Sequence, residues 1–125
     1  MIRMTIHGEF GSLNEFIDQN RRRRGNWSGG NDMKRKDQGM IEWQLPRFHT
    51  NKPIWISYRF FCKNRKRDKD NVSGYFHKIF QDALVAKRCI NNDGWKDIIG
   101  FSDEFFVDAR NPRVEVEIHE GKNPG

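Results

Sequence analysis

The alternation of apolar and polar side chains predicts three strands, each with one buried face. In Ile54–Cys62 every even position is apolar or aromatic, whereas Ser57 and Arg59 point the other way. The stretch Arg113–His119 alternates without a break, and Met1–Glu9 shows a shorter alternation of the same kind. A period of two is typical of strands that lie with one face on a core, so all three stretches are expected in a sheet.

A different spacing predicts two helices. Ser12 is suited to cap a helix that begins at Leu13, because Glu15 occupies the capping-box position. A longer helix is expected from about Gly74 to Lys87, where apolar residues recur at intervals of three and one, as on a helix packed against a sheet. Its apolar face, with the residues that lead into it, consists of Val72, Tyr75, Phe76, Ile79, Phe80, Ala83 and Leu84.

The remaining stretches complete the predicted order. Met40–Leu45 is expected to form a second strand, and Ile98–Val107 a strand that follows the Asn91–Gly94 turn. Residues 20–39 are expected to form a mobile basic loop, and residues 120–125 a short tail.

These elements predict an α+β (mixed α/β) fold in one domain that spans residues 1–125. The predicted order is strand, helix, strand, strand, helix, strand, strand, with two main helices packed on a mixed sheet. A chain of this length forms one ordinary domain with a sizeable core.

Charge is distributed unevenly along the chain, which carries a net charge of +6. Residues 51–70 hold seven basic and two acidic side chains, whereas residues 71–125 hold seven basic and nine acidic ones. A basic segment attracts polyanions, because phosphates that are neutralised by Lys and Arg release condensed counterions. Composition therefore favours nucleic-acid binding, and by itself it does not distinguish an enzyme from a binding module.

Neither disulfides nor a membrane segment is expected. Cys62 and Cys89 lack CxxC spacing, so we expect free thiols in a reducing cytoplasm. No stretch approaches the ~18 apolar residues of a transmembrane helix, and Met1–Phe10 lacks the apolar centre of a signal peptide. The pattern is typical of a soluble protein.

Asp68 and Asp70 are the strongest candidates for chemistry. In an extended segment, residues at i and i+2 project on the same side, so both carboxylates can share one cation. Magnesium prefers oxygen ligands and keeps several waters, and the five cations between residues 63 and 69 suit a DNA backbone. The same two aspartates also suit a helix start, where Asp is a common cap. Spacing alone leaves both interpretations open.

Other metal sites are excluded by their spacing. An EF-hand loop that began at Asp68 would need glycine where Ser73 stands and glutamate where Ile79 stands. The four histidines are scattered, and none lies at zinc-ligand spacing from a cysteine.

Three motifs in a fixed order resemble the RusA-type Holliday junction resolvases, in their Gram-positive and phage branch. The motifs are Arg67-Asp68-Lys69-Asp70-Asn71, Lys78-Ile79-Phe80-Gln81-Asp82-Ala83-Leu84 and Asn92-Asp93-Gly94-Trp95. The similarity continues through Gly100-Phe101, Val107-Asp108 and Asn111–Val116, and covers roughly residues 52–118. One departure is that six residues separate Asn71 from Lys78, more than in the enterobacterial form of the family.

The resemblance implies that Asp68, Asp70 and Asp93 bind a metal and that Lys78 is the catalytic lysine. The implied cofactor is Mg²⁺, which Mn²⁺ could replace, with no small-molecule cofactor. The implied reaction is phosphodiester hydrolysis in branched DNA, at four-way junctions, during recombination and repair. A homodimer is expected, because resolving a junction needs two opposed cuts.

The resemblance also implies a bacterial cytoplasmic protein, or a phage protein that acts in a bacterial host. Basic residues at the end of the first predicted helix and before the second are expected to bind DNA. These are Arg65, Lys66, Arg67, Lys69, Arg21, Arg22, Arg23 and Arg24.

Several alternatives stay open on the sequence alone. A basic module without catalysis explains the charge, a different metal nuclease explains the carboxylates, and a structural or partner-binding phage protein needs neither. Lys78 would pair with Asp82 if the two lie one helical turn apart. Residues 20–39 could contact DNA phosphates or form a solvated surface. Trp95 and Phe101 are expected to pack in the core, with stacking on opened bases as the alternative.

Overall fold

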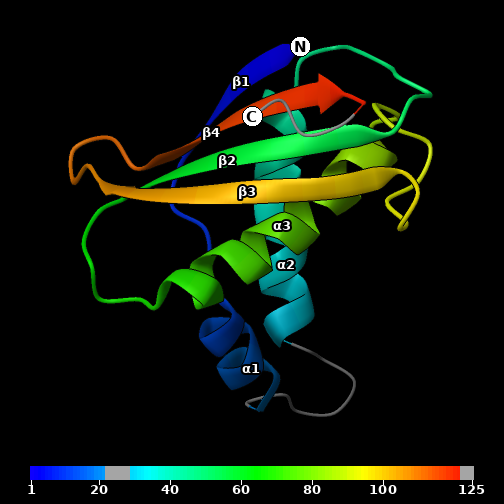
Figure 1. Ribbon diagram of the computed structural model, residues 1–125. Helices are drawn as coiled ribbons and strands as arrows, with labels where there is room; N and C mark the ends of the chain where they lie inside the picture. Colours follow the sequence, from blue (N-terminus) through cyan, green and yellow to red (C-terminus); the bar gives the residue numbers. More distant parts are fainter. Residues whose placement is uncertain (22–28, 122–125) are drawn as a thin grey trace.

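A four-stranded sheet with helices on one face organises the chain (Figure 1). The computed structural model describes residues 1–21 and 29–121. Its elements are β1 (Ile2–His7), α1 (Leu13–Arg21), α2 (Gly29–Gln44), β2 (Ile54–Cys62), α3 (Lys69–Ala86), β3 (Ile98–Val107) and β4 (Arg113–Glu120). The predicted α+β class is confirmed. Across the described ranges, no helix has both the length and the apolar content that a membrane span requires.

The sheet has the strand order β1-β4-β2-β3. β4 pairs antiparallel with both β1 and β2, whereas β3 pairs parallel with β2. A parallel pair needs a crossover connection, and α3 supplies it. Because α3 begins after the carboxyl end of β2 and stops before the amino end of β3, its two ends lie at opposite ends of these strands (Figure 1).

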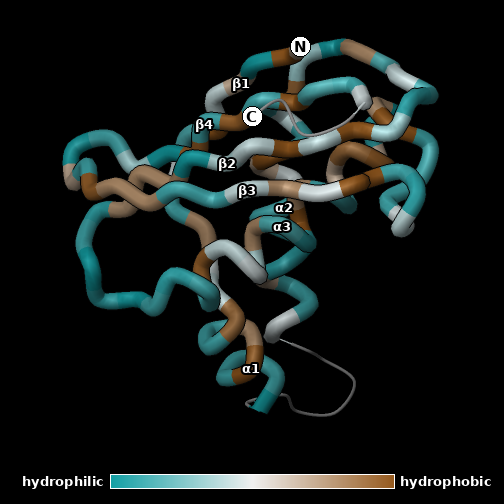
Figure 2. The backbone as a smooth tube through the Cα atoms, viewed as in Figure 1, coloured by the Kyte–Doolittle hydropathy of each residue, from teal (hydrophilic) through white to brown (hydrophobic). Residues whose placement is uncertain are grey.

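The core lies between the sheet and α3, as the periodicity predicts. Tyr58 and Phe60 on β2 and Phe76 on α3 are each 1% exposed. The even positions of β2 from Ile54 to Phe60 and those of β4 from Val114 to Ile118 are buried. The rings meet edge to face, with centroids 5.6 Å apart for Phe60 and Phe76, an arrangement that aromatic quadrupoles favour. Figure 2 shows the hydrophobic positions on the strands and on the faces of the helices.

The helix α2 contradicts two predictions. Met40–Leu45 is not a strand, because α2 continues to Gln44, and residues 29–39 are helical rather than a loop. Ile41 is fully buried and Asp37, one turn earlier, is 7% exposed. A short apolar run does not reveal its period, and here the helical period holds. The described part of the chain therefore has three helices where two were predicted.

A buried carboxylate explains why so polar a segment is helical. Asp37 Oδ2 accepts hydrogen bonds from the Gly11 amide at 3.0 Å and from the Tyr75 hydroxyl at 2.8 Å. These bonds join α2 to the segment before α1 and to α3, and buried polar groups are stable only when they are paired in this way. Tertiary contacts, rather than local propensity, hold α2 in place.

The smaller predictions have mixed outcomes. The cap of α1 is confirmed, since Ser12 Oγ accepts the Glu15 amide at 3.3 Å. The two cysteines are free thiols, with Cys89 buried and Cys62 half-buried, and burial raises the pKa of each. Glu120 belongs to β4 and not to a tail. Residues 22–28 of the predicted loop and 122–125 of the predicted tail lie outside the described residues.

Candidate metal and nucleic-acid site

Asp68 and Asp70 lie at the start of α3. Asp68 is the residue before the helix, with extended backbone angles (φ −66°, ψ 143°), and its side chain makes no capping hydrogen bond. Asp70 belongs to the first turn, and both residues are exposed. Asp68 therefore occupies the cap position without using its carboxylate as a cap. Two carboxylates are left facing solvent, in the chemistry that Mg²⁺ prefers.

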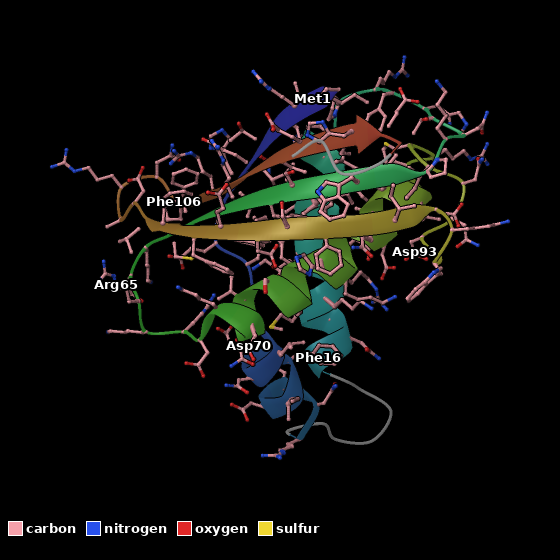
Figure 3. All side chains as sticks on the ribbon, in the orientation of Figure 1. Met1, Phe16, Arg65, Asp70, Asp93 and Phe106 are labelled. Atoms are coloured by element: carbon pink, nitrogen blue, oxygen red, sulfur yellow. The ribbon has the colours of Figure 1, made fainter. Side chains whose placement is uncertain are left out.

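The loop from β2 to α3 leads to this pair and carries several Lys and Arg side chains. It forms a continuous hydrophilic stretch that swings away from the sheet (Figure 2). Arg65 lies on its outer side (Figure 3). The Asn64 side chain accepts the Lys66 amide at 2.9 Å, a local turn that shapes the loop. The cations of this loop therefore stand where a nucleic-acid backbone could reach both them and the carboxylates.

Two of the cations predicted to bind DNA also make contacts within the protein. Arg67 donates a hydrogen bond to the Phe10 carbonyl at 2.7 Å and forms an ion pair with Glu15. Lys69 Nζ lies 5.6 Å from the centroid of the Phe105 ring. Arg67 therefore anchors the loop to the segment before α1. DNA contacts by Arg67 and Lys69 stay predictions.

A cavity of about 310 Å³ opens between this loop and the end of the sheet. Its lining combines aromatic rings, cations and one carboxylate, Glu9, which pairs with Lys63 at 3.4 Å. The rings include Phe10, Phe61 and Phe76, and the cations include Lys63, Lys66 and Arg113. An aromatic wall with a cationic rim is suited to a flat, electron-rich group.

Arg113 is a site residue for which the sequence predicted no role. Its guanidinium carbon lies 3.8 Å from the centroid of the Phe61 ring, and its nitrogens pair with Asp108 at 2.8 Å and Glu115 at 3.0 Å. The hydrogen bond from Arg113 lowers the pKa of Asp108. The sequence held a signal for this contact, because Phe61 places an aromatic ring on the otherwise polar face of β2, and Phe61 is paired with Arg113 in the sheet.

Asp93 lies beyond the opposite end of α3 from Asp70 (Figure 3). The 18 residues of α3 span about 27 Å at the rise of an α-helix. Among residues 1–21 and 29–121, no three His, Cys, Asp or Glu side chains form a group that could hold a metal ion. One copy of the chain therefore places Asp68 and Asp70 at one end of α3 and leaves Asp93 apart from them.

Lys78 points to a different partner from the one the resemblance implies. Its Nζ lies 3.4 Å from Asp82 Oδ1, one helical turn away, and Asp82 also pairs with Lys34 at 3.5 Å. Lys78 lies eight positions after Asp70, about 12 Å along the helix. The alternative pair is formed, and the Lys78 side chain is still 63% exposed. Its catalytic role stays a prediction.

The aromatic residue next to Asp93 is exposed. Trp95 is 98% exposed, so the prediction of core packing is wrong for it. The turn that carries it lies past the end of α3 and leads into β3 (Figure 1). Phe101 on β3 is 47% exposed, with its ring centroid 4.4 Å from that of His77, so it is only partly packed.

The arginines at the end of α1 complete the predicted site residues. Arg21 is the last residue of α1 and is exposed. Arg22, Arg23 and Arg24 lie outside the described residues.

Comparison with known proteins identifies no relative. A scan against models of protein families matches none of them, and a search of curated proteins finds no match.

Proposed function

We propose that this protein is a metal-dependent endonuclease that cuts four-way DNA junctions as a homodimer. The observation that carries the proposal is the pair Asp68 and Asp70, two exposed carboxylates at a helix start where the Asp68 side chain makes no capping hydrogen bond. The loop that leads to this position carries four cations, and a fifth, Lys69, lies between the two aspartates. The ordered motifs that resemble the RusA-type resolvases support the same function.

The donor set fits Mg²⁺, because hard carboxylate oxygens and room for water and a substrate phosphate are what this ion takes. When bound by Asp68 and Asp70, the cation would supply Lewis-acid stabilisation of charge on the phosphate. Lys63, Arg65 and Lys66 would hold the neighbouring backbone phosphates. Such contacts position the DNA without reading its sequence.

We further propose that the third ligand comes from a second copy. Asp93 lies at the far end of α3, about 27 Å along the helix from the pair, so it cannot join Asp70 within one subunit. A two-fold axis that brings the start of one α3 to the end of the other would create two equal sites. Each would hold Asp68 and Asp70 of one subunit and Asp93 of the partner subunit. Two sites also match the two opposed cuts that a junction requires.

The test is cleavage of a synthetic four-way junction with Mg²⁺, compared with linear duplex of the same sequence. The substitution Asp70→Asn should lower the cutting rate on the order of 1,000-fold, because several kcal/mol of metal-derived stabilisation are lost. Asp18→Asn, the same change at an exposed position on α1, is the matched control. Equal cutting of linear duplex would contradict junction specificity. Equal activity of the two variants would contradict the metal site.

One observation favours a second candidate, a DNA-binding module without catalysis. In the described part of a single copy, no three carboxylate, His or Cys groups assemble around a metal position. This candidate predicts that no preparation cuts any branched substrate, and that Asp70→Asn and Asp18→Asn bind the junction equally well.

A further inference from the structure

We infer that Trp95 of each subunit inserts into the cavity beside Asp68 and Asp70 of the partner subunit. The inference rests on the proposed shared metal site and identifies the contact that would hold the two subunits together. Three observations support it. The Trp95 indole is exposed, a cavity lies near Asp68 and Asp70, and both the indole and the cavity lining are close in sequence to the proposed metal-binding aspartates.

The exposed indole stands on a turn held by backbone hydrogen bonds. The amides of Asp97 and Ile98 both donate to the Gly94 carbonyl, at 3.0 Å and 3.1 Å. Trp95 lies inside this turn and is 98% exposed. A large apolar ring in this position gains free energy when a surface covers it, and tryptophan is enriched at the centres of protein interfaces.

The cavity has the size and chemistry for an indole. About 310 Å³ is open between the loop and the sheet, with Phe10, Phe61 and Phe76 in its lining. Lys63 and Lys66 also line it. Indole is the ring that binds cations best, and its apolar body suits the aromatic wall. The turn carries Asp93 and Asp97 beside Lys96, a net charge of −1. The cavity lining holds four cations and one carboxylate, Glu9, which pairs with Lys63 at 3.4 Å, so the two net charges are opposite.

The spacing along the chain places the two features in register. Trp95 is two residues from Asp93, and the cavity-lining residues Lys66 and Val72 are two residues from Asp68 and Asp70. Two residues span at most about 7 Å. When Asp93 of the partner subunit meets the Asp68 and Asp70 pair, Trp95 of the partner subunit therefore comes within reach of the cavity. Each dimer would contain this contact twice.

The first test compares two exposed tryptophans by sedimentation equilibrium without DNA. Trp95→Ala should raise the dimer dissociation constant by about 30-fold or more, because a buried interface tryptophan is a typical hot spot. Trp43→Ala is the matched control, since Trp43 is 90% exposed at the end of α2 and lines no part of the cavity. Equal dissociation constants for the two variants would overturn the inference.

The second test fills the cavity from within. Cys62 lines the cavity and is half-buried. Cys62→Phe should weaken the dimer as Trp95→Ala does, and the double variant should be no weaker than either alone, because both remove one contact. Cys62→Ser is the control for the loss of the thiol. Circular dichroism confirms that each variant is folded, and additive losses in the double variant would contradict insertion.

A cross-link identifies the occupant even if the cavity variant does not fold. The protein concentration is kept above the dimer dissociation constant of Trp95→Ala, and Cys89→Ser removes the other thiol. Trp95→Cys should then be joined to Cys62 of the partner subunit by a short bismaleimide, giving a covalent dimer. Trp43→Cys in the same background should stay monomeric on a denaturing gel. The absence of a covalent dimer from Trp95→Cys would overturn the inference.

The outcomes also separate this inference from the proposed function. If Trp95→Ala leaves the dimer intact and weakens only junction binding, Trp95 stacks on DNA and the inference fails while the nuclease proposal stands. If the wild-type protein dimerises through Trp95 and cuts no branched DNA with Mg²⁺, the inference stands and the proposed function fails.

Discussion

The two ends of α3 differ in what they offer a ligand. The amino-terminal end has two exposed carboxylates, a basic loop and a cavity, whereas the carboxyl-terminal end has Asp93 and an exposed tryptophan on a turn. Each end holds what the other lacks, and one helix keeps them about 27 Å apart. Under the proposed function, two copies of the chain would therefore complete a site that one copy holds only in part.

The two ends also differ in how the fold holds them. Near the amino-terminal end, Tyr75 donates to Asp37 of α2, and Arg67 binds the segment before α1. After the carboxyl-terminal end, the chain enters β3, which pairs with β2 alone at the edge of the sheet. Helices therefore support one half of the proposed site, and an edge strand supports the other.

The largest expected effect concerns Lys78, which lies between the two ends. If it stabilises charge on the phosphate, Lys78→Gln should lower the cutting rate by about 100- to 1,000-fold, as losses of electrostatic donors do. Stability should change little, because its exposed pair with Asp82 contributes only about 0.5 kcal/mol. Single-turnover rates measure the effect, with Lys52→Gln as the control. If Lys78→Gln cuts at the wild-type rate, Lys78 has no catalytic role and only its ion pair with Asp82 remains.

The next effect tests the support of the amino-terminal end. Asp37→Ala should lower the free energy of unfolding by about 2–3 kcal/mol, because the Gly11 amide and the Tyr75 hydroxyl lose their acceptor. Burial raises the pKa of Tyr75, so its hydroxyl stays protonated and keeps donating through neutral pH. Urea unfolding measures the change. Asp32→Ala, at a less buried position on α2, should cost under about 0.5 kcal/mol, and a similar loss in both variants would contradict the role of Asp37.

A smaller effect tests the support of the carboxyl-terminal end. A Cβ at Gly100 would lie 2.1 Å from the Trp55 ring, so Gly100→Ala should destabilise the fold by about 1–2 kcal/mol. Gly39→Ala is the opposite case, since a Cβ there meets nothing within 4 Å and alanine favours the helix by about 1 kcal/mol. Thermal unfolding compares the two. Stabilisation by both would show that Trp55 moves aside without cost.

The smallest effect compares the charges of the two ends. Lys66→Gln should weaken junction binding a few-fold. It should also reduce the slope of the logarithm of the binding constant against the logarithm of the salt concentration by about one, the amount expected for one lost phosphate contact. Lys87→Gln, at the carboxyl-terminal end, should leave the slope unchanged. Binding titrations at several salt concentrations distinguish them, and equal slopes for both variants would remove the loop from the DNA interface.

Periodicity in the sequence is enough to predict β2 and most of α3, because their buried faces recur at regular intervals. The predicted start of α3 near Gly74 is wrong, since the helix begins at Lys69, where polar residues give no periodic signal. Periodicity does not predict α2, whose helix depends on the hydrogen bonds of Asp37 and on a close approach to α1. A Cβ at Gly30 would lie 2.4 Å from the Asn20 side chain, so any other residue there would require the Asn20 amide to move. Such contacts join residues far apart in the sequence, and local patterns do not record them.

The candidate site divides in the same way. Asp68 and Asp70 are neighbours in sequence, so local spacing predicts that they lie close together. The extended segment predicted for both is wrong for Asp70, because α3 begins at Lys69 and only Asp68 keeps extended backbone angles. The separation of Asp93 follows from the parallel pairing of β2 and β3, which places the loops before and after α3 at opposite ends of the strands. Trp95 has a large apolar side chain of the kind usually found in a core. It is exposed because its turn lies past the end of α3, which local sequence does not reveal.

The central claim, that two subunits share each metal site, is tested most directly by mixing inactive variants. Asp70→Asn and Asp93→Asn should each abolish junction nicking. In a mixed dimer one site receives both substitutions and the other receives neither, so nicking should return.

Random mixing makes about half of the dimers mixed, each with one intact site of two, so about a quarter of the wild-type sites should be active. A mixture of Asp70→Asn with Asp68→Asn is the control and should stay inactive, because each site keeps one substitution. Nicking by the first mixture alone is the predicted result. If the Asp70→Asn and Asp93→Asn mixture is as inactive as the control, the two residues do not act across subunits and the account is wrong.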